Sequence, residues 1–470
     1  MRKLFYLASF LFLLISQGHA AVTATTVWEF RTDAGDLNNG SCFDGSVAVP
    51  GTDYSFPQAS SQYNGTDLVI DGVDNTKVTS ATHNFVAADE GNCVRVSAGT
   101  GFTVGWYVIT DTSANAATLS SAVGTTGSTG GTYRVGGAAL LNSTNADDYF
   151  EAMVAGNTGW FLYNASAHAV GEAVSVVADA TSTTVISING YNTTRGDNPT
   201  GANRPVIDIA AQSFTMTGDY FNFSNLIFTV TSATGFTSGI GSVFRNVKIT
   251  NSSVTAGRPA LSINTAGKVF DSEFISTNGN AITGNGSNAI FHGNYIHDSV
   301  TCLNMPGNDF NVVSFNSIDT CSTAGIALGS ASESNKFLFN TIYGAETPAG
   351  TGMSAAATQS TNTTLIGNIF YGWVTGISFN ANVQSTFADY NDFFNNTTNR
   401  QFIDAGPNDL GVDPAFTNAA SGDFSIGTAL KAAGFPGAFQ GATSTGYLDV
   451  GAVQRQEPAG GSGGSFTFVQ

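Results

Sequence analysis

Charged residues are scarce in this sequence, and basic ones are scarcer than acidic ones. Only 11% of the 470 residues are charged, and 16 Lys and Arg residues stand against 34 Asp and Glu residues, a net charge of −18. An acidic surface repels phosphate backbones, which argues against nucleic acid as a partner. Long apolar runs are also absent beyond the first 20 residues. No later segment holds the run of about 18 apolar residues that a membrane-spanning helix requires.

The low charge does not make this a disordered acidic chain. Apolar residues make up 42% of the sequence, and there are 35 Phe residues. Disordered acidic segments have few aromatic and apolar residues, because they cannot bury enough surface to offset their conformational entropy. We therefore expect a folded protein of stacked strands whose outer faces are neutral and rich in hydroxyl groups.

The first 20 residues have the pattern of a secretory signal peptide. Arg2 and Lys3 precede an apolar run from Leu4 to Ile15, and the segment ends in Gly-His-Ala. The run is too short for a membrane span, and small residues close it. We predict cleavage after Ala20, which leaves 14 basic and 34 acidic residues, a net charge of −20. The mature chain is then secreted or held at the cell surface, with the periplasm as an alternative.

Cysteine is rare, with four residues and no CxxC pair. The absence of such a pair argues against a cysteine metal site, and no metal-ligating residues are assigned. In an exported chain four cysteines permit two disulfides. We predict the pairs Cys42–Cys93 and Cys302–Cys321, each between residues of one region. The second pair lies eight and five residues after the repeat position described next, so a turn has to absorb that offset.

An asparagine recurs at intervals of 22, 24, 28 and 23 residues in the second half of the chain, each time inside a short apolar phrase such as Val-Ser-Phe-Asn-Ser-Ile. The positions are Asn294, Asn316, Asn340, Asn368 and Asn391. A repeat of this length with strand-like and no helical phrases is typical of a solenoid that winds one short set of strands per turn. Each side-chain amide is expected to bond to its equivalent one coil away, and an Asn at a bend between two strands tolerates the left-handed conformation.

Earlier phrases extend this alignment. Leu226, Val247 and Glu273 are placed as the equivalents of the five asparagines, and the residues three before and two after each position are expected to face inward. With that alignment the chain divides into a signal peptide (1–20), an N-terminal cap and first strand (21–60), a small β insertion or sub-domain (61–140), the solenoid (141–455) and a Gly/Ser-rich tail (456–470). One short helix is expected within 146–156.

The alignment places three ionisable residues on one outward column of consecutive coils, two positions before the repeat position. They are Arg245, Asp271 and His292. A cation, a carboxylate and an imidazole at this spacing can bind an acidic sugar or perform acid–base catalysis, so they are the candidate catalytic residues. The alternative is a cross-coil salt bridge beside a solvated histidine.

Other polar residues on the same coils are candidates for contacting a substrate. They are Lys248, Tyr295, His297 and Asp319, with Glu273 and Asp298 as weaker candidates. Tyr343 and Tyr371, each three residues after a repeat asparagine, either form a strip on which sugar rings stack or pack beneath a loop.

Several phrases resemble a known group. They resemble right-handed parallel β-helix proteins of the pectate-lyase-like superfamily. The resemblance lies in the Asn-x-Ile phrases followed by Gly-Ile phrases and in the opening Gly-Asp-Leu-Asn-Asn-Gly (35–40). It also lies in the closing segment, with Asp-Leu-Gly-Val-Asp-Pro (409–414), Gly-Asp-Phe-Ser-Ile (422–426) and Asp-Val-Gly-Ala (449–452). The resemblance implies an all-β fold, a right-handed parallel β-helix with a small N-terminal β sub-domain or insertion. It also implies contact with polysaccharide or a cell-surface glycan.

The functional expectation is an exported β-helix surface protein that binds glycan or has a structural or adhesive role. A polysaccharide-degrading enzyme is the alternative, and a lyase is favoured over a glycoside hydrolase because no column holds closely spaced carboxylates. Such a lyase would use Ca²⁺ against the substrate carboxylate; no other cofactor is implied. A third hypothesis is a virus-encoded tailspike-like protein, and the predicted signal peptide argues against it. The oligomeric state, the glycan, and the roles of 61–140 and of the tail stay open.

Overall fold

The computed structural model of the protein describes most of the chain after residue 62. The described residues are 27–30, 32, 63–86, 93–136, 138–139, 141, 146–151, 153–177, 180–193, 195–231, 235–329, 332–345, 349–355, 360–381, 385–436 and 448–454. The predicted signal peptide, Cys42 and the Gly/Ser-rich tail lie outside them. The chain divides into two compact units, one with Met1–Val22 and Asp36–Ala138 and the other with Thr23–Gly35 and Ala139–Gln470. The predicted boundaries at 60, 140 and 455 fall on residues outside the described ranges and stay predictions.

The first unit contains a closed barrel of antiparallel strands. In barrel order these are β2 (Tyr63–Ile70), β3 (Lys77–Thr79), β6 (Ala116–Leu119), β5 (Gly105–Ser113), β4 (Cys93–Ala98) and β7 (Thr129–Gly136). Alternate residues such as Leu68, Ile70, Val94 and Val96 fill its interior, as the two-residue period of a strand requires.

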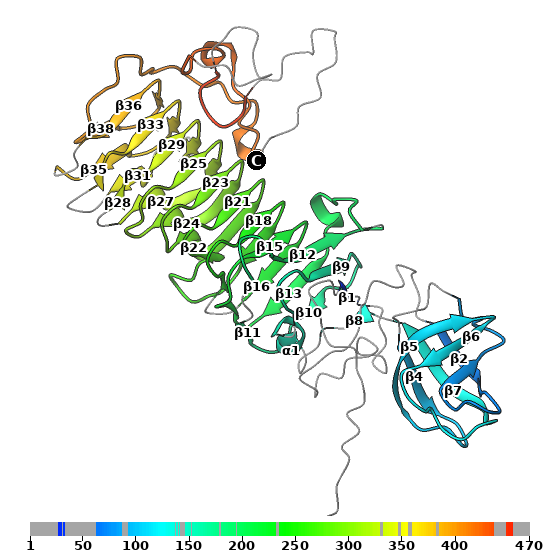
Figure 1. The fold of residues 1–470 in the computed structure, drawn as a ribbon. Coiled ribbons are helices and arrows are strands. Elements are labelled where there is room, and N and C mark those ends of the chain that lie inside the picture. Colours follow the sequence, from blue (N-terminus) through cyan, green and yellow to red (C-terminus); the bar gives the residue numbers. More distant parts are fainter. Residues whose placement is uncertain are drawn as a thin grey trace, which may run out of the picture. The chain divides into compact units, whose positions relative to one another are not determined.

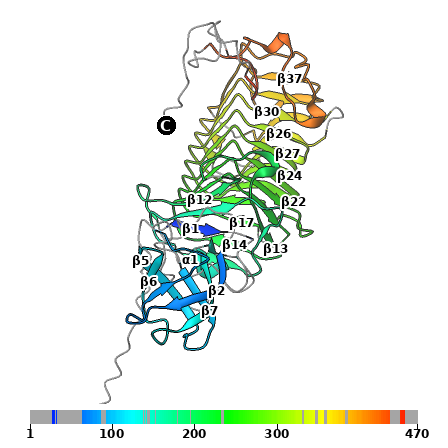
Figure 2. The same ribbon diagram turned by 90° about the vertical axis from the view of Figure 1, so that its right-hand side faces the viewer.

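The second unit is a right-handed parallel β-helix, which confirms the predicted fold class. Along the described residues each coil adds one strand to a 12-stranded sheet and one longer strand or two shorter ones to an 18-stranded sheet. Figures 1 and 2 show the coils following one another in chain order. The strands of the first sheet, in order, are β36 (Phe387–Asp389), β33 (Thr364–Ile366), β29 (Lys336–Leu338), β25 (Val312–Ser314), β23 (Ile290–His292), β21 (Lys268–Phe270), β18 (Val243–Arg245), β15 (Phe221–Ser224), β12 (Ile186–Tyr191), β9 (Thr158–Leu162), β1 (Val27–Phe30) and β8 (Ala138–Ala139).

The second sheet follows chain order throughout. Its strands are β10 (His168–Ala169), β11 (Val174–Val176), β13 (Val206–Ala210), β14 (Phe214–Met216), β16 (Ile227–Val230), β17 (Phe236–Thr237), β19 (Lys248–Asn251), β20 (Leu261–Ile263), β22 (Glu273–Gly284), β24 (Tyr295–Met305), β26 (Ser317–Asp319), β27 (Cys321–Leu328), β30 (Thr341–Tyr343), β31 (Thr351–Ala355), β34 (Ile369–Tyr371), β35 (Thr375–Phe379), β37 (Asp392–Phe394) and β38 (Thr398–Gln401). β28 (Ser332–Glu333) and β32 (Ser360–Thr361) pair separately.

Helix is limited to short pieces in the described residues. The α-helix α1 (Ala146–Glu151) forms within the predicted range 146–156, and three 3₁₀ turns are η3 (Gly201–Asn203), η4 (Ala419–Ser421) and η5 (Thr428–Leu430). None of the helices in the described part of the chain is long and apolar enough to cross a membrane.

Stacked apolar side chains fill the β-helix interior. Phe223 and Phe244, equivalent residues on adjacent coils, have nearly parallel rings with centroids 5.1 Å apart, and Phe370 and Phe393 repeat this arrangement at 5.1 Å. Burying each such ring contributes about 2–3 kcal/mol. These stacks keep the coils in register, so a side chain on one outer face lies directly beside its equivalents on the coils before and after it.

The repeat asparagines form the predicted ladder at the corner between the two sheets. Asn316 Oδ1 accepts hydrogen bonds from the main-chain N–H and the side-chain Nδ2 of Asn294, at 3.0 and 2.9 Å. Asn340, Asn368 and Asn391 repeat both bonds along the stack, so the buried amides of the ladder are paired with one another. This confirms the structural role predicted for the asparagines.

The left-handed residue of each corner is the one before the asparagine and not the asparagine itself. Positive φ occurs at Gly293 (69°), Phe315 (55°), Phe339 (54°), Gly367 (67°) and Tyr390 (57°). The chain turns at that residue, and the asparagine that follows points its amide inward. Phe315 and Phe339 therefore carry aromatic side chains in a conformation that usually favours glycine.

Cys302 and Cys321 form the predicted disulfide. Their Cα atoms are 5.7 Å apart, and both side chains are buried between neighbouring coils. Asp298 and Thr320 are left-handed residues at equivalent places on the two coils, and the strand pairing shifts register after them, between Ser299–Cys321 and Thr301–Ala324. The other predicted pair cannot be placed, because Cys42 lies outside the described residues.

Candidate functional site

The alignment of one coil differs from the sequence-based one by a single residue. Arg245 pairs with Phe270, and Phe270 pairs with His292, so Asp271 does not belong to that column. Ser272, whose N–H donates to Asn294 Oδ1 at 3.0 Å, is the equivalent of the repeat asparagines in place of Glu273. Glu273 instead follows Lys248 on the outward column after the corner. The predicted column Arg245–Asp271–His292 is corrected accordingly.

The three candidate catalytic residues nevertheless lie near one another. Arg245 Nη1 is 3.8 Å from Asp271 Oδ2, and its guanidinium lies 4.6 Å from the centre of the Phe270 ring. The Arg245 and Asp271 side chains are 49% and 63% exposed, so this ion pair contributes little to stability. His292 Nδ1 lies 2.9 Å from Ser314 Oγ on the next coil. Burial lowers the pKa of His292, so its ring is neutral at pH 7.

A second group of polar residues lies on the other side of the corner and forms a continuous network. Lys248 Nζ donates to Glu273 Oε1 at 2.8 Å. His297 Nε2 is 3.2 Å from the same oxygen, and His297 Nδ1 is 2.8 Å from Asp298 Oδ2. Both nitrogens of the His297 ring therefore face carboxylates. The network joins β19, β22 and β24, three successive coils.

Tyr295 is fixed between this network and the next coil. Its ring is parallel to the His297 ring, with centroids 3.9 Å apart. Its hydroxyl donates to Asp319 Oδ2 at 3.1 Å, and Asp319 is buried. The structure thus brings together the four predicted substrate-contacting residues, with Lys248 linked to the others through Glu273.

The network shifts the pKa values of its members in opposite directions. The hydrogen bond from His297 is the main cause that lowers the pKa of Glu273 to about 2; burial opposes it, and Lys248 adds to it. Burial alone would lower the pKa of His297, but the hydrogen bonds to Glu273 and Asp298 outweigh burial and raise it. Burial, followed by the Asp319 charge, raises the pKa of Tyr295 well above its usual range. His297 is the protonated partner of the network, and Tyr295 keeps its proton.

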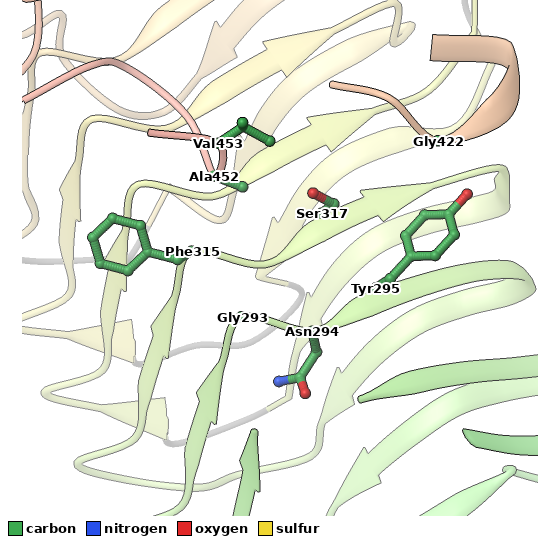
Figure 3. Close-up of a pocket in the computed structure, with 8 residues that line it drawn as sticks. All are labelled: Gly293, Asn294, Tyr295, Phe315, Ser317, Gly422, Ala452 and Val453. Carbon is green, nitrogen blue, oxygen red and sulfur yellow. The ribbon is translucent and has the colours of Figure 1, made fainter. Parts of the chain in front are cut away.

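An open pocket of about 440 Å³ lies beside Tyr295. Figure 3 shows Tyr295 and Phe315 on opposite sides with Ser317 between them. Gly293 and Asn294 of the corner line it from the β-helix, and Gly422, Ala452 and Val453 line it from the C-terminal segment, by which we mean the described residues 409–436 and 448–454. The pocket joins the two groups of candidates, because His292 precedes Gly293 and its ring contacts Phe315 at a centroid distance of 5.3 Å.

Phe315, Ser317 and the C-terminal residues of the pocket were not among the predicted site residues. Ser317 occupies the same outward column as Tyr295, so the alignment contained the signal for it. No such signal exists for Gly422, Ala452 and Val453, because their position depends on how the C-terminal segment folds back.

Tyr343 and Tyr371 do not form an exposed strip. Their rings stack on each other at 5.0 Å, and Phe416 of the C-terminal segment packs against both. Of the two possibilities left open by the sequence, packing beneath a loop is the one observed.

No three His, Cys, Asp or Glu side chains within the described residues are arranged to hold a metal ion. We therefore assign no ligands to the Ca²⁺ that a lyase would use.

The comparisons with known proteins concern the fold. The family model described as a right handed beta helix region matches residues 236–398. Among solved structures, the pectate lyase Pel9A is similar at 13% identity with a TM-score of 0.45, covering 67% of this chain and 91% of its own. The PL6 family polysaccharide lyase Pedsa3628 from Pseudopedobacter saltans is similar at 9% identity with a TM-score of 0.27, covering 60% and 94%. No curated protein matches.

The protein is thus a right-handed parallel β-helix protein, as its sequence predicted. The likeness to the two lyase structures is too weak to carry an argument about activity. In addition, one fold hosts many functions.

Proposed function

We propose that this is an exported surface protein that binds a glycan in the pocket between Tyr295 and Phe315 and does not cleave it. The observation that carries the proposal is the fixed Tyr295 ring at the edge of an open pocket of about 440 Å³. Small-molecule sites are concave, mostly apolar, and contain a few fixed polar groups.

The chemistry of the pocket suits a sugar ring. The faces of a pyranose carry apolar C–H groups that pack on aromatic rings, and its edges carry hydroxyls that need hydrogen-bond partners. Tyr295 and Phe315 supply the aromatic sides, and Ser317 supplies a hydroxyl. Because the stack on His297 and the bond to Asp319 already hold Tyr295, little side-chain entropy is lost when a ligand packs against it.

The contacts around the pocket favour recognition over acid–base chemistry. A general base needs an unprotonated atom within reach of the substrate proton. Both ring nitrogens of His297 face carboxylates, the ammonium of Lys248 is paired with Glu273, and Tyr295 keeps its proton because its pKa is raised.

A polysaccharide lyase is the second candidate, and His292 is the observation in its favour. Its ring is neutral at pH 7 because burial lowers its pKa, and it lies beside the pocket residues Gly293 and Phe315. The charges of Asp271 and Arg245, on the preceding coils, act on this histidine.

One experiment separates these functions. Residues 21–470 are tested against a panel of polysaccharides with and without Ca²⁺, and binding is recorded together with the ultraviolet absorbance of unsaturated sugar products. We expect binding without new absorbance, loss of binding in Tyr295→Ala, and retention in Tyr295→Phe, which keeps the ring. New absorbance that disappears in His292→Ala would instead establish a lyase. If neither binding nor new absorbance is detected, the glycan-binding proposal is contradicted.

A further inference from the structure

The pocket belongs to an outward column that crosses the coils of the β-helix. One residue per coil contributes to this column, and strand pairing fixes the order. The members are Lys248, Glu273, Tyr295, Ser317, Thr341, Ile369 and Asp392. Successive members lie about 4.8 Å apart, the spacing of paired strands, which is comparable to the length of one sugar unit in an extended chain. A glycan that followed the column would therefore place about one sugar on each coil.

The C-terminal segment covers the column on one side of the pocket. The N–H of Ala452 donates to Thr341 Oγ1 at 3.0 Å, and the N–H of Gly451 donates to the carbonyl of Gly367 at 2.8 Å. Gly451 adopts φ 94°, and a Cβ atom there would lie 2.6 Å from Ile369 Cδ1. The backbone of the segment thus lies directly on the column, where only glycine fits.

The same segment continues over the last coil of the column. The N–H of Val412 donates to Asp392 Oδ1 at 2.8 Å. As a result Thr341, Ile369 and Asp392 are completely buried. A glycan chain cannot follow the column past Ser317 in this direction without displacing the segment.

The column is open on the other side of the pocket. The side chains of Lys248 and Glu273 retain 30% and 27% exposure, against none for Thr341. Figure 3 shows Gly422, Ala452 and Val453 gathered on the side of Ser317 and Tyr295 that faces the C-terminal coils. The column is therefore partly exposed to solvent toward Lys248 and covered at Ala452.

We propose that the pocket binds the terminal sugar of a glycan chain, and that the chain leaves along the column past Glu273 and Lys248. Internal segments of a polysaccharide are excluded, because Ala452 blocks the path that a continuing chain would take. This inference rests on the proposed glycan-binding function and narrows its ligand to chain ends.

The test is the number of protein molecules bound per glycan chain, measured by titration calorimetry. The probes are oligogalacturonides, an acidic series, and cello-oligosaccharides, a neutral one, each fractionated into short, intermediate and long chains. We expect one protein per chain at every length, with an affinity per chain that stops rising once the chain extends past Lys248. A number that grows with chain length would overturn end recognition while leaving glycan binding intact. Absence of binding to both series would contradict the proposed function itself.

Chemical modification of the chain ends gives a second readout that needs no variant. The series that binds is reduced at its reducing end or capped at its non-reducing end. End recognition predicts that one of the two modifications weakens binding at least about tenfold, which corresponds to about 1.4 kcal/mol. If neither modification changes the affinity, the inference fails.

A pocket-filling variant locates the binding site. Ser317→Trp places a large ring in the pocket, whereas Ser262→Trp places the same ring at an outward serine of β20, outside the pocket. Circular dichroism first checks that both variants are folded. Ser317→Trp is then expected to weaken binding at least about tenfold, and Ser262→Trp to leave it unchanged. Equal affinity in the two variants would place the chain end elsewhere.

Discussion

Asp409 Oδ1 accepts hydrogen bonds from the main-chain N–H and the side-chain Nδ2 of Asn391, at 2.8 and 3.3 Å, and so takes the place of the next asparagine in the ladder. Its other oxygen pairs with Arg400 Nη2 at 2.7 Å. The ladder therefore ends in a carboxylate supplied by the C-terminal segment, which ties that segment to the last coil.

Removal of this carboxylate should destabilise the protein. Asp409→Ala removes the acceptor of the Asn391 main-chain N–H and the carboxylate paired with Arg400, and the Asp409 side chain is only 3% exposed. The expected loss is about 3 kcal/mol in the free energy of unfolding, measured by chemical denaturation. Asp404→Ala, an exposed aspartate nearby, is the control and should change stability by less than about 0.5 kcal/mol.

An interior member of the ladder should be similarly sensitive. Asn340→Ala removes an amide that accepts from the N–H and Nδ2 of Asn316 and donates to the carbonyl of Val313. Leaving these buried groups unpaired should cost roughly 2–4 kcal/mol in thermal or chemical unfolding. The exposed Asn285→Ala serves for comparison. A ladder variant as stable as this control would show that the amides do not hold the coils together.

The disulfide between Cys302 and Cys321 should also contribute to stability. It closes a loop with a sequence separation of 19, for which the entropic effect on the unfolded chain is about 3 kcal/mol. The double variant Cys302→Ser, Cys321→Ser is expected to lose about that amount under non-reducing conditions. Unchanged unfolding in the double variant would contradict this expectation.

Glu273 should make stability depend on pH in the acid range. Its pKa is about 2 in the folded protein against an ordinary value of 4.5, so its contribution is present above pH 4.5 and is lost as the pH falls toward 2. Glu273→Gln is expected to be roughly 2 kcal/mol less stable than the unmodified protein at pH 6, with the difference shrinking below pH 4.5. Glu333→Gln, at an exposed glutamate on β28, is the matched surface control.

Asp392 should have the opposite dependence. Burial raises its pKa from 3.8 to about 7, with the Asp413 and Asp409 charges adding to the shift, so the folded state holds a proton that the unfolded state has lost. Stability from this group therefore declines as the pH rises from 3.8 to about 7. Asn at this position cannot ionise. The free energy of unfolding of Asp392→Asn should therefore decline less than that of the unmodified protein as the pH rises through this range. Parallel pH profiles of the two proteins would contradict the assignment.

The ladder and the coils were predictable from the sequence, but one coil was aligned one residue out of register. The cause is two pairs of adjacent apolar residues on that coil. Val269 and Phe270 are adjacent, as are Phe274 and Ile275, so either member of each pair satisfies the inward pattern. The structure buries Val269 and Phe274, and the corner residue is Asp271 at φ 49°. A shift of one residue exchanges the inward and outward faces of a strand, which is why Asp271 was assigned to the column that Phe270 occupies.

The polar cluster was predictable in part because its members recur at the repeat spacing. Lys248 and Tyr295 occupy the same outward position on their coils, and His297 lies two residues further along β24. The cover of the C-terminal segment over the column was not predictable, because Ala452 contacts Thr341 across 111 positions of sequence. No local pattern encodes a contact of that range.

A crystal structure of residues 21–470 in complex with the tightest-binding oligosaccharide of the panel would decide whether the pocket holds the end of a glycan chain. We expect a terminal sugar ring between Tyr295 and Phe315, with the next units directed toward Glu273 and Lys248. Sugar density on any other face of the molecule, or a chain that passes through the pocket in both directions, would contradict end recognition in this pocket.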